Sequence, residues 1–146
     1  MTGELMARSW RPGDEDAFTP RADFLKAANL QPFNDETARR TLAYTLVRDT
    51  EPEVVLGIAG LTCIEPDGWR LWARTADLRP REWAQAGVLT GHVLDWFHRT
   101  LPQARVSASA ADAVSRRYLE ALGFVLLDGD EMGLDGAIYR ILERAA

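Results

Sequence analysis

The sequence predicts a single α/β domain with a mixed central sheet of about six strands and three or four helices. Two observations lead to this fold class. Segments that alternate like strands recur between segments with helical periodicity, and no internal repeat or low-complexity linker separates them. A length of 146 residues supports one hydrophobic core, so we expect one domain over residues 1–146.

The first third of the chain is predicted to be mainly helical. Residues 5–10 have the composition of a short strand, and the acids after it are typical of a helix start, so a helix is expected over residues 14–29. A second helix is expected over residues 34–51, because Leu42 and Leu46 lie one helical turn apart.

The rest of the chain alternates between strands and helices. Glycines and continuous apolar residues predict a buried central strand over residues 54–64, which a turn at residues 65–68 joins to the next strand. The strongest helical period follows, with proline at its first turn. The further expected elements are strand 69–77, helix 80–101, strand 104–110, helix 112–122 and strands 124–128 and 137–142.

Composition and charge exclude several classes of protein. Hydrophobic residues make up 47% and charged residues 27%, which is typical of globular domains and excludes a disordered chain. No apolar run reaches the roughly 18 residues of a membrane span, and the start lacks a signal-peptide pattern. A net charge of −5 disfavours nucleic acid as the main partner. We therefore expect a cytoplasmic protein with no membrane or nucleic-acid partner.

The sequence predicts no metal site. Cys63 is the one cysteine of the chain, which excludes an internal disulfide, and its apolar neighbours predict an inert buried thiol. His92 and His98 lie about 240° apart on a helix and cannot share a metal ion. The acids from Asp128 to Asp135 lack the ligand pattern of a calcium loop, so a polar hairpin turn is the better interpretation.

One segment resembles a known family. Residues 110–124, which read Ala-Ala-Asp-Ala-Val-Ser-Arg-Arg-Tyr-Leu-Glu-Ala-Leu-Gly-Phe, resemble the final conserved block of the GNAT acyltransferase superfamily. In that block a strand leads into a helix that ends in Leu-Gly-Phe. Among GNAT proteins the chain is most similar to small phage-encoded acetyltransferase-like proteins, which share a Trp-containing strand and an aromatic-Leu-x-x-Leu-Gly-Phe ending. The resemblance implies a GNAT-like sheet and acetyl-CoA as the cofactor of active members.

The phosphate-binding motif of that family is missing. Active members usually carry Arg/Gln-x-x-Gly-x-Gly/Ala where the fourth strand meets its helix, so that backbone N–H groups can approach the CoA diphosphate. Here residues 78–87 read Leu-Arg-Pro-Arg-Glu-Trp-Ala-Gln-Ala-Gly, which fits in no register. Pro80 has no N–H, and Glu82 is expected to place a negative charge beside any phosphate. The sequence therefore predicts a degenerate acyl-CoA site.

The general acid of the family is also missing from its usual position. A tyrosine four residues before the glycine of Leu-Gly-Phe often protonates the CoA thiolate, but this chain has Leu119 there. Tyr118 lies one position earlier, about 100° round the helix, on the apolar stripe. Core packing and catalysis are both open interpretations of Tyr118. The resemblance also places Asp112 where the family often has asparagine.

The candidate ligand-binding residues are therefore few. Arg79 and Arg81 could hold phosphate through their guanidinium groups, although solvated surface arginines are the favoured interpretation. Trp83 and Asp112 complete the cofactor-binding candidates.

Tryptophan is concentrated in the middle of the chain. Four indoles fall within 28 residues, at positions 69, 72, 83 and 96, and Trp96 projects away from the apolar stripe of its helix. An exposed indole of this kind is typical of a protein contact. We therefore expect a protein partner or self-assembly.

Two hypotheses for function follow. The first is a phage-type GNAT-fold protein with a degenerate acyl-CoA site that serves as a virion-associated or other protein-binding component. The second is an acetyl-CoA-dependent N-acetyltransferase in which a substrate amine attacks directly, with the cofactor between the fourth and fifth strands. A third possibility keeps acyl-CoA binding without chemistry, as in a sensor.

Overall fold

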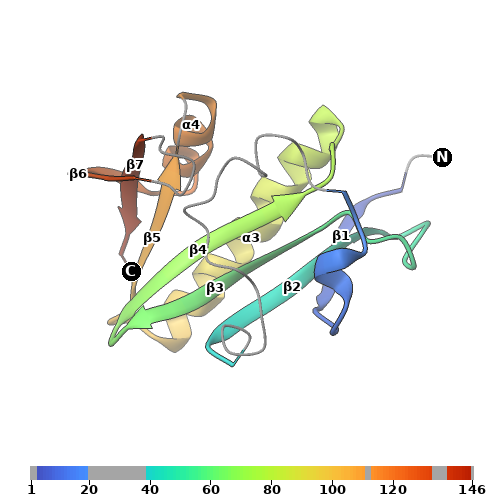
Figure 1. Ribbon diagram of the computed structural model, residues 1–146, viewed down its shortest axis with the longest axis horizontal. Helices are drawn as coiled ribbons and strands as arrows, with labels where there is room; N and C mark the ends of the chain where they lie inside the picture. Colours follow the sequence, from blue (N-terminus) through green and yellow to red (C-terminus); the bar gives the residue numbers. More distant parts are fainter. Residues whose placement is uncertain (1–2, 20–38, 111–112, 133–137, 146) are drawn as a thin grey trace.

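The computed structural model describes residues 3–19, 39–110, 113–132 and 138–145 as one seven-stranded sheet with helices. The strands are β1 (Leu5–Ser9), β2 (Thr41–Arg48), β3 (Gly57–Glu65), β4 (Gly68–Thr75), β5 (Arg105–Ala110), β6 (Val125–Met132) and β7 (Ile138–Arg144). The helices are the short 3-10 helix η1 (Asp14–Asp16), α3 (Pro80–Thr100) and α4 (Ala113–Ala121). Figure 1 shows the elements in the spatial order β1-β2-β3-β4-β5-β7-β6. The predicted α/β class is confirmed, with seven strands in place of about six.

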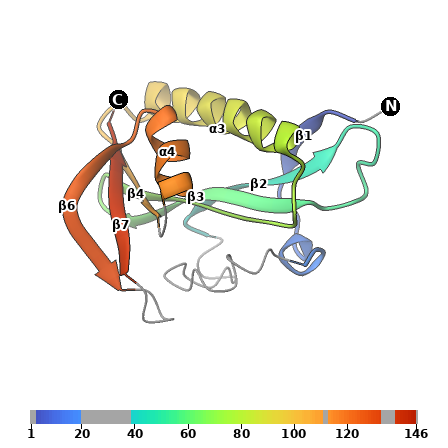
Figure 2. The ribbon, with the colours of Figure 1, turned by 90° about the horizontal axis from the view of Figure 1, so that it is seen from above.

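The sheet is mixed because one strand pair is parallel. β4 and β5 run in the same direction, and the other five pairings are antiparallel. A parallel connection needs a crossover, and α3 provides it between β4 and β5. Figure 2 shows that α3 and α4 lie on the same face of the sheet.

The helix predicted over residues 34–51 is wrong in its described part, because residues 41–48 form β2. β2 pairs with β1 on one side and β3 on the other. Leu42 and Leu46 are four residues apart, which places them on one face of a strand as well as of a helix. The β-branched Thr45 and Val47 alternate with them and favour the strand.

The helix predicted over residues 14–29 is not formed in its described part. Asp14 begins the 3-10 turn η1, and residues 17–19 are not helical. Residues 20–29 lie outside the described ranges. Asp14 does not cap a helix, because its buried carboxylate accepts hydrogen bonds from Arg8, Thr45 and the backbone N–H of Arg11.

The predicted hairpin of β3 and β4 is confirmed, and its glycines are required by close packing. A Cβ on Gly57 would lie 2.6 Å from the carbonyl oxygen of Arg74, and one on Gly60 would lie 2.9 Å from that of Leu42. Residues 57–62 are buried, as expected for a central strand. The hairpin turns at Asp67, which adopts a positive φ of 59°.

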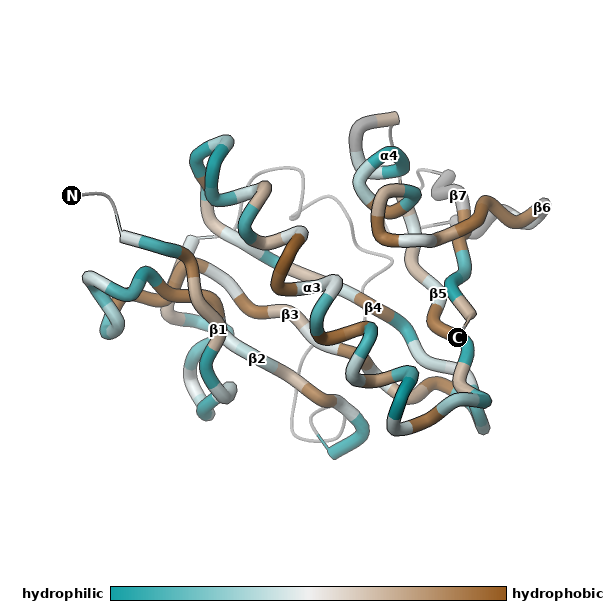
Figure 3. Tube along the Cα trace, turned by 180° about the vertical axis from the view of Figure 1, so that it is seen from behind, coloured by the Kyte–Doolittle hydropathy of each residue, from teal (hydrophilic) through white to brown (hydrophobic). Residues whose placement is uncertain are grey.

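The helix predicted over residues 80–101 is confirmed as α3, which begins at Pro80. Its buried residues include Ala86, Leu94 and Phe97, which face the sheet. Leu101, within the predicted range, follows the last residue of α3 and is exposed. Figure 3 shows the resulting alternation of hydrophobic and hydrophilic residues along α3.

The C-terminal part follows the prediction with longer strands. α4 ends at Ala121, and Gly123 follows in the turn after it with a φ of +94°, which suits the glycine expected there. β6 and β7 extend beyond the predicted 124–128 and 137–142, and β6 forms one edge of the sheet. The larger core cluster joins α3, α4 and the strands β3, β4, β5 and β7. It consists of Leu61, Leu71, Leu94, Phe97, Ala104, Val106, Ala108, Ala110, Leu119, Phe124 and Leu142.

Candidate functional site

The parallel strands β4 and β5 separate along their length, and the candidate site lies at this opening. They pair through Gly68 with Arg105, Trp69 with Val106 and Arg70 with Ser107. β5 then continues beside β7 as far as Ala110, while β4 continues beside β3 as far as Thr75. Figure 1 shows the two strands diverging toward the N-terminal end of α3.

The N-terminal end of α3 is closed by its own residues. Pro80 occupies the first helical position and has no N–H to donate. The carboxylate of Glu82 turns back and accepts the backbone N–H of Arg79 at 2.9 Å, as in a capping box. A helix terminus that could offer amide groups to an anion therefore already holds an internal carboxylate.

Glu82 also forms a buried ion pair with β2. The Arg48 guanidinium donates to both carboxylate oxygens, with Nε to Oε2 at 2.6 Å and Nη2 to Oε1 at 3.0 Å. The hydrogen bonds from Arg48 lower the pKa of Glu82, against burial that raises it, and the Arg79 N–H lowers it further. Glu82 is therefore ionised and is only 3% exposed.

The structure has an ionised Glu82 at the start of α3, where the sequence predicts a negative charge, and it also pairs that charge with an arginine. The charge of Glu82 is balanced by Arg48, which lies 34 positions away in the sequence. No local pattern in the sequence indicates this pairing. The Glu82 carboxylate therefore already uses the Arg79 N–H at the start of α3.

The predicted phosphate-binding arginines lie at this end of α3 but do not converge. Arg79 is the exposed N-cap residue, and Arg81 is exposed and forms an ion pair with Glu4 ahead of β1. Trp83 is partly buried on the next turn. Asp112 lies outside the described residues.

Tyr118 lies between the two helices, beside the opening of the sheet. A Cβ on Gly87 of α3 would lie 3.5 Å from the Tyr118 ring and 3.8 Å from its hydroxyl oxygen. The Tyr44 hydroxyl of β2 lies 3.4 Å from Thr90 Oγ1. Burial raises the pKa of Tyr118, and a hydrogen bond with Thr90 lowers it in part.

The residue at the family's usual tyrosine position belongs to the core. Leu119 is buried in the main cluster, so no proton donor stands there. Tyr118 also packs against that cluster, which agrees with the core interpretation. The Tyr118 hydroxyl contacts Thr90, and Tyr44 lies close to both. The sequence did not indicate that these three residues meet, because Tyr44 was predicted to lie on a helix.

The remaining predicted residues have simple surroundings. His92 is exposed on α3. Cys63 is half-buried rather than buried, and its thiol donates to the carbonyl of Glu65 at 3.4 Å. Trp96 is exposed, as its position on α3 predicts. The described part of the chain contains no group of His, Cys, Asp or Glu residues able to hold a metal ion.

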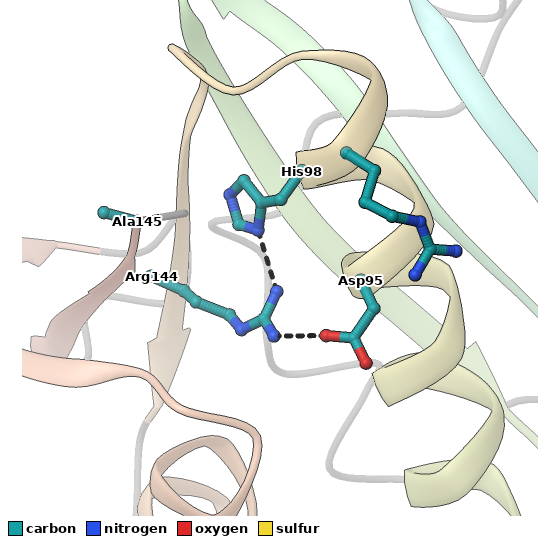
Figure 4. A pocket seen from close by; sticks show the side chains of 5 residues that line it. Asp95, His98, Arg144 and Ala145 are labelled. Atoms are coloured by element: carbon teal, nitrogen blue, oxygen red, sulfur yellow. Dashed lines mark hydrogen bonds and ion pairs between the residues drawn. The ribbon is translucent and has the colours of Figure 1, made fainter.

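The sequence did not predict the contacts of His98 at the other end of α3. Arg144 of β7 donates from Nη1 to His98 Nδ1 at 2.8 Å and from Nη2 to Asp95 at 2.7 Å (Figure 4). These side chains line a shallow open pocket of about 370 Å³ together with Arg99 and Ala145. A guanidinium only donates, so Nδ1 accepts and the neutral ring carries its proton on Nε2.

The environment of His98 favours the neutral ring. Burial lowers the pKa of His98, the positive charge of Arg144 lowers it further, and a backbone hydrogen bond with Ala104 and the charge of Asp95 oppose both. The result is a pKa below the ordinary value of 6.5. This group ties the last strand to α3, and no catalytic arrangement is implied by it.

Comparison with solved structures identifies the fold. A GCN5-related N-acetyltransferase from Kribbella flavida aligns over 97% of this chain and 98% of that chain, at 17% identity and a TM-score of 0.66. A putative acetyltransferase from Sphaerobacter thermophilus DSM 20745 aligns over 97% and 94%, at 15% identity and a TM-score of 0.63. The chain has the GNAT fold. A ribosomal-protein-S5-alanine acetyltransferase from Vibrio fischeri aligns over 99% and 94%, at 14% identity and a TM-score of 0.63.

These similarities concern the GNAT fold, and the activity must be argued from the site. No protein-family profile matches the sequence, and no curated protein is significantly similar to it. Within the described ranges, no helix is long and apolar enough to cross a membrane.

Acetyl-CoA is the cofactor that neighbours with the GNAT fold imply, and the residues at α3 do not fit its diphosphate. The Arg79 N–H already donates to Glu82, and Pro80 has none to give. Arg81 is engaged with Glu4 at the surface. The carboxylate at this terminus is held to Arg48 by two further hydrogen bonds.

Proposed function

We propose that this protein uses the GNAT fold as a protein-binding component and does not carry out acetyl-CoA chemistry. The observation that carries the proposal is the Glu82 carboxylate at the start of α3, bound to Arg48 and to the Arg79 N–H. An ionised group held there by three hydrogen bonds competes with any diphosphate for the same donors. The exposed indole of Trp96 supports protein contacts as the alternative use of the fold.

The resemblance to small phage-encoded acetyltransferase-like proteins suggests the finer form of this proposal, a component of a virion. If this form is correct, mass spectrometry of purified particles from the source of the gene detects the chain at a fixed ratio to the capsid proteins. A chain that remains with the soluble fraction during particle purification contradicts the virion form and leaves the broader proposal to be judged by ligand binding.

Calorimetry with acetyl-CoA and with CoA tests the broader proposal. The expected result is no saturable heat up to millimolar ligand. Because adenine nucleotides share the diphosphate, ADP serves as a control that separates diphosphate binding from recognition of the pantetheine arm. Micromolar affinity for acetyl-CoA would contradict the proposal.

An acetyl-CoA-dependent N-acetyltransferase is the second candidate, and one observation favours it. The opening between β4 and β5 is present, and the Tyr118 hydroxyl lies beside it near Thr90 and Gly87. Release of free thiol from acetyl-CoA in the presence of a library of amines measures this activity. Thiol release that the Tyr118→Phe variant loses would support the second candidate, and binding without thiol release would indicate an acyl-CoA sensor.

A further inference from the structure

The outer face of α3, which points away from the sheet, carries two opposite charges placed symmetrically about an exposed apolar residue. Val88 is 58% exposed, and Arg81 and Asp95 lie seven residues before and after it. Seven residues are two helical turns, so the three side chains lie within about 20° of one line along the helix. Trp96 is 48% exposed at the edge of the same face.

Each of the two charges is already joined to a partner of opposite sign. Arg81 forms an ion pair with Glu4 at the N-terminal end of α3. Asp95 forms an ion pair with Arg144 at the C-terminal end, at 2.7 Å. The N-terminal end therefore presents an outward arginine and the C-terminal end an outward carboxylate, both of them exposed.

We propose that this face binds a second copy of the chain, with the two α3 helices antiparallel and Val88 next to the two-fold axis. Such a symmetric contact places residues whose numbers add to 176 opposite each other. Val88 then meets Val88 of the second copy, and Arg81 meets Asp95 of the second copy twice. Trp96 comes to lie against Pro80 of the second copy.

Charge complementarity is the reason for choosing a second copy as the occupant. The dimer contains two equivalent rows of charges of alternating sign. Each row runs from Glu4 and Arg81 of one copy to Asp95 and Arg144 of the second copy. Networks of alternating charges contribute more than isolated surface pairs. Antiparallel helices also bring the positive end of each helix dipole beside the negative end of the other.

The exposed edge of the sheet is less suited to self-association. Val125 on β6 is 66% exposed, which exceeds the exposure of Val88. The sequence of β6 contains three acidic residues and no basic one, so pairing of two such edges would bring together segments of like charge. Val125 therefore serves as a matched control of similar size and greater exposure.

A contact made by one helix from each copy falls at the small end of protein interfaces, so the dimer is expected to be reversible. Sedimentation equilibrium of the full chain at about 100 µM measures it. The wild type is expected to be dimeric, Val88→Glu to raise the dissociation constant at least about tenfold, and Val125→Glu to leave it unchanged. A monomeric wild type, or an equal response to both substitutions, would overturn the proposal.

Two further variants test the register. Arg81→Glu and Asp95→Arg should each weaken the dimer, and the combined variant should recover part of the loss, because the exchanged charges again face each other while Glu4 and Arg144 lose their partners. In a Cys63→Ser background, Val88→Cys should form a disulfide-linked dimer under mild oxidation, and Val125→Cys should not. Failure of both the restoration and the cross-link would overturn the antiparallel register.

This inference rests on the proposed function, since it names a partner for a protein that acts through contacts. The two can fail separately. Dimerisation is measured without any ligand, and acetyl-CoA binding is measured on the Val88→Glu variant as well as on the wild type. Absence of a dimer overturns only the inference, whereas micromolar acetyl-CoA binding overturns the proposed function whatever the state of association.

Discussion

An arginine joins each end of α3 to the sheet, but the acidic partner of that arginine is buried at one end and exposed at the other. At the N-terminal end, Glu82 is buried and receives both arms of Arg48 from β2. At the C-terminal end, Arg144 from β7 divides its donors between buried His98 and exposed Asp95. The ion pair at the N-terminal end is buried. Solvent reaches the group at the C-terminal end, so its charges can change with pH.

This difference leaves the carboxylate at the N-terminal end almost fully buried and the one at the C-terminal end exposed. Burial of a carboxylate is tolerated when its charge is paired and its oxygens are hydrogen-bonded, as those of Glu82 are. Removing either partner leaves an uncompensated buried charge. The C-terminal group loses less on perturbation, because water can reach Asp95 and part of the pocket.

The largest effect is expected from breaking the closed end. Glu82→Gln leaves the Arg48 guanidinium without its counter-charge and should lower the free energy of unfolding by about 3 kcal/mol, measured by urea denaturation. Glu120→Gln is the control, because Glu120 pairs with Arg116 at 3.5 Å on the exposed face of α4. Equal stability of the two variants would contradict the structural role of Glu82.

Asp14 is a second buried carboxylate with an arginine partner, and it tests whether such pairs contribute similarly to stability. Burial raises the pKa of Asp14, but hydrogen bonds from Arg8, Thr45 and the Arg11 backbone outweigh it and lower the pKa from 3.8 to about 2. Asp14→Asn should therefore cost about 2 kcal/mol at pH 7. Its neighbour Asp16 is exposed, so Asp16→Asn should cost much less.

The pH dependence of the Asp14 pair has a defined sign. Because the folded pKa is depressed, the stabilisation is complete above pH 3.8 and is lost as the pH falls toward about 2. Thermal unfolding across this window should show a steeper loss of stability for the wild type than for Asp14→Asn. Parallel curves for the two proteins would argue against a depressed pKa.

The stability that the C-terminal group contributes through His98 should change at a higher pH than the stability contributed by Asp14. Folded His98 has a pKa below 6.5, so the unfolded chain binds more protons and stability falls as the pH is lowered from 6.5 toward the folded pKa. His98→Gln should remove this dependence and cost about 1 kcal/mol at pH 7 through the lost contact with Arg144. His92→Gln, on the exposed face of the same helix, should retain the dependence of the wild type.

The smallest effect is expected from the exposed partner at the open end. Asp95→Asn keeps an acceptor for Arg144 and removes a charge that solvent already screens. Its melting temperature should stay within the error of the measurement at physiological salt, while dimerisation weakens. A large loss of stability would mean that the two ends of α3 are more alike than the exposure of Asp95 indicates.

The parts of the fold that depend on local sequence could be predicted. α3 was predicted because Pro80 and a regular apolar stripe define it within a few turns. The end of α4 was predicted because Gly123, just after the helix, accepts a positive φ. β2 was mistaken for a helix because the spacing of Leu42 and Leu46 fits both periods, and its two neighbouring strands decide the matter.

The contacts that define the candidate site are not local and could not be predicted. The sequence identified the irregular start of α3, including Pro80 and Glu82, but not the partner of Glu82. Arg48 lies 34 positions before Glu82, and Arg144 lies 46 positions after His98. Side chains this far apart meet only through sheet order, which one sequence does not specify.

The central claim is that the N-terminal end of α3 is closed to the CoA diphosphate. Titration of isotope-labelled protein with CoA, followed through the backbone amide resonances of Arg79, Arg81, Glu82 and Trp83, tests it directly. The account predicts that these resonances keep their positions up to millimolar CoA. Saturable shifts of these amides at micromolar CoA would contradict it.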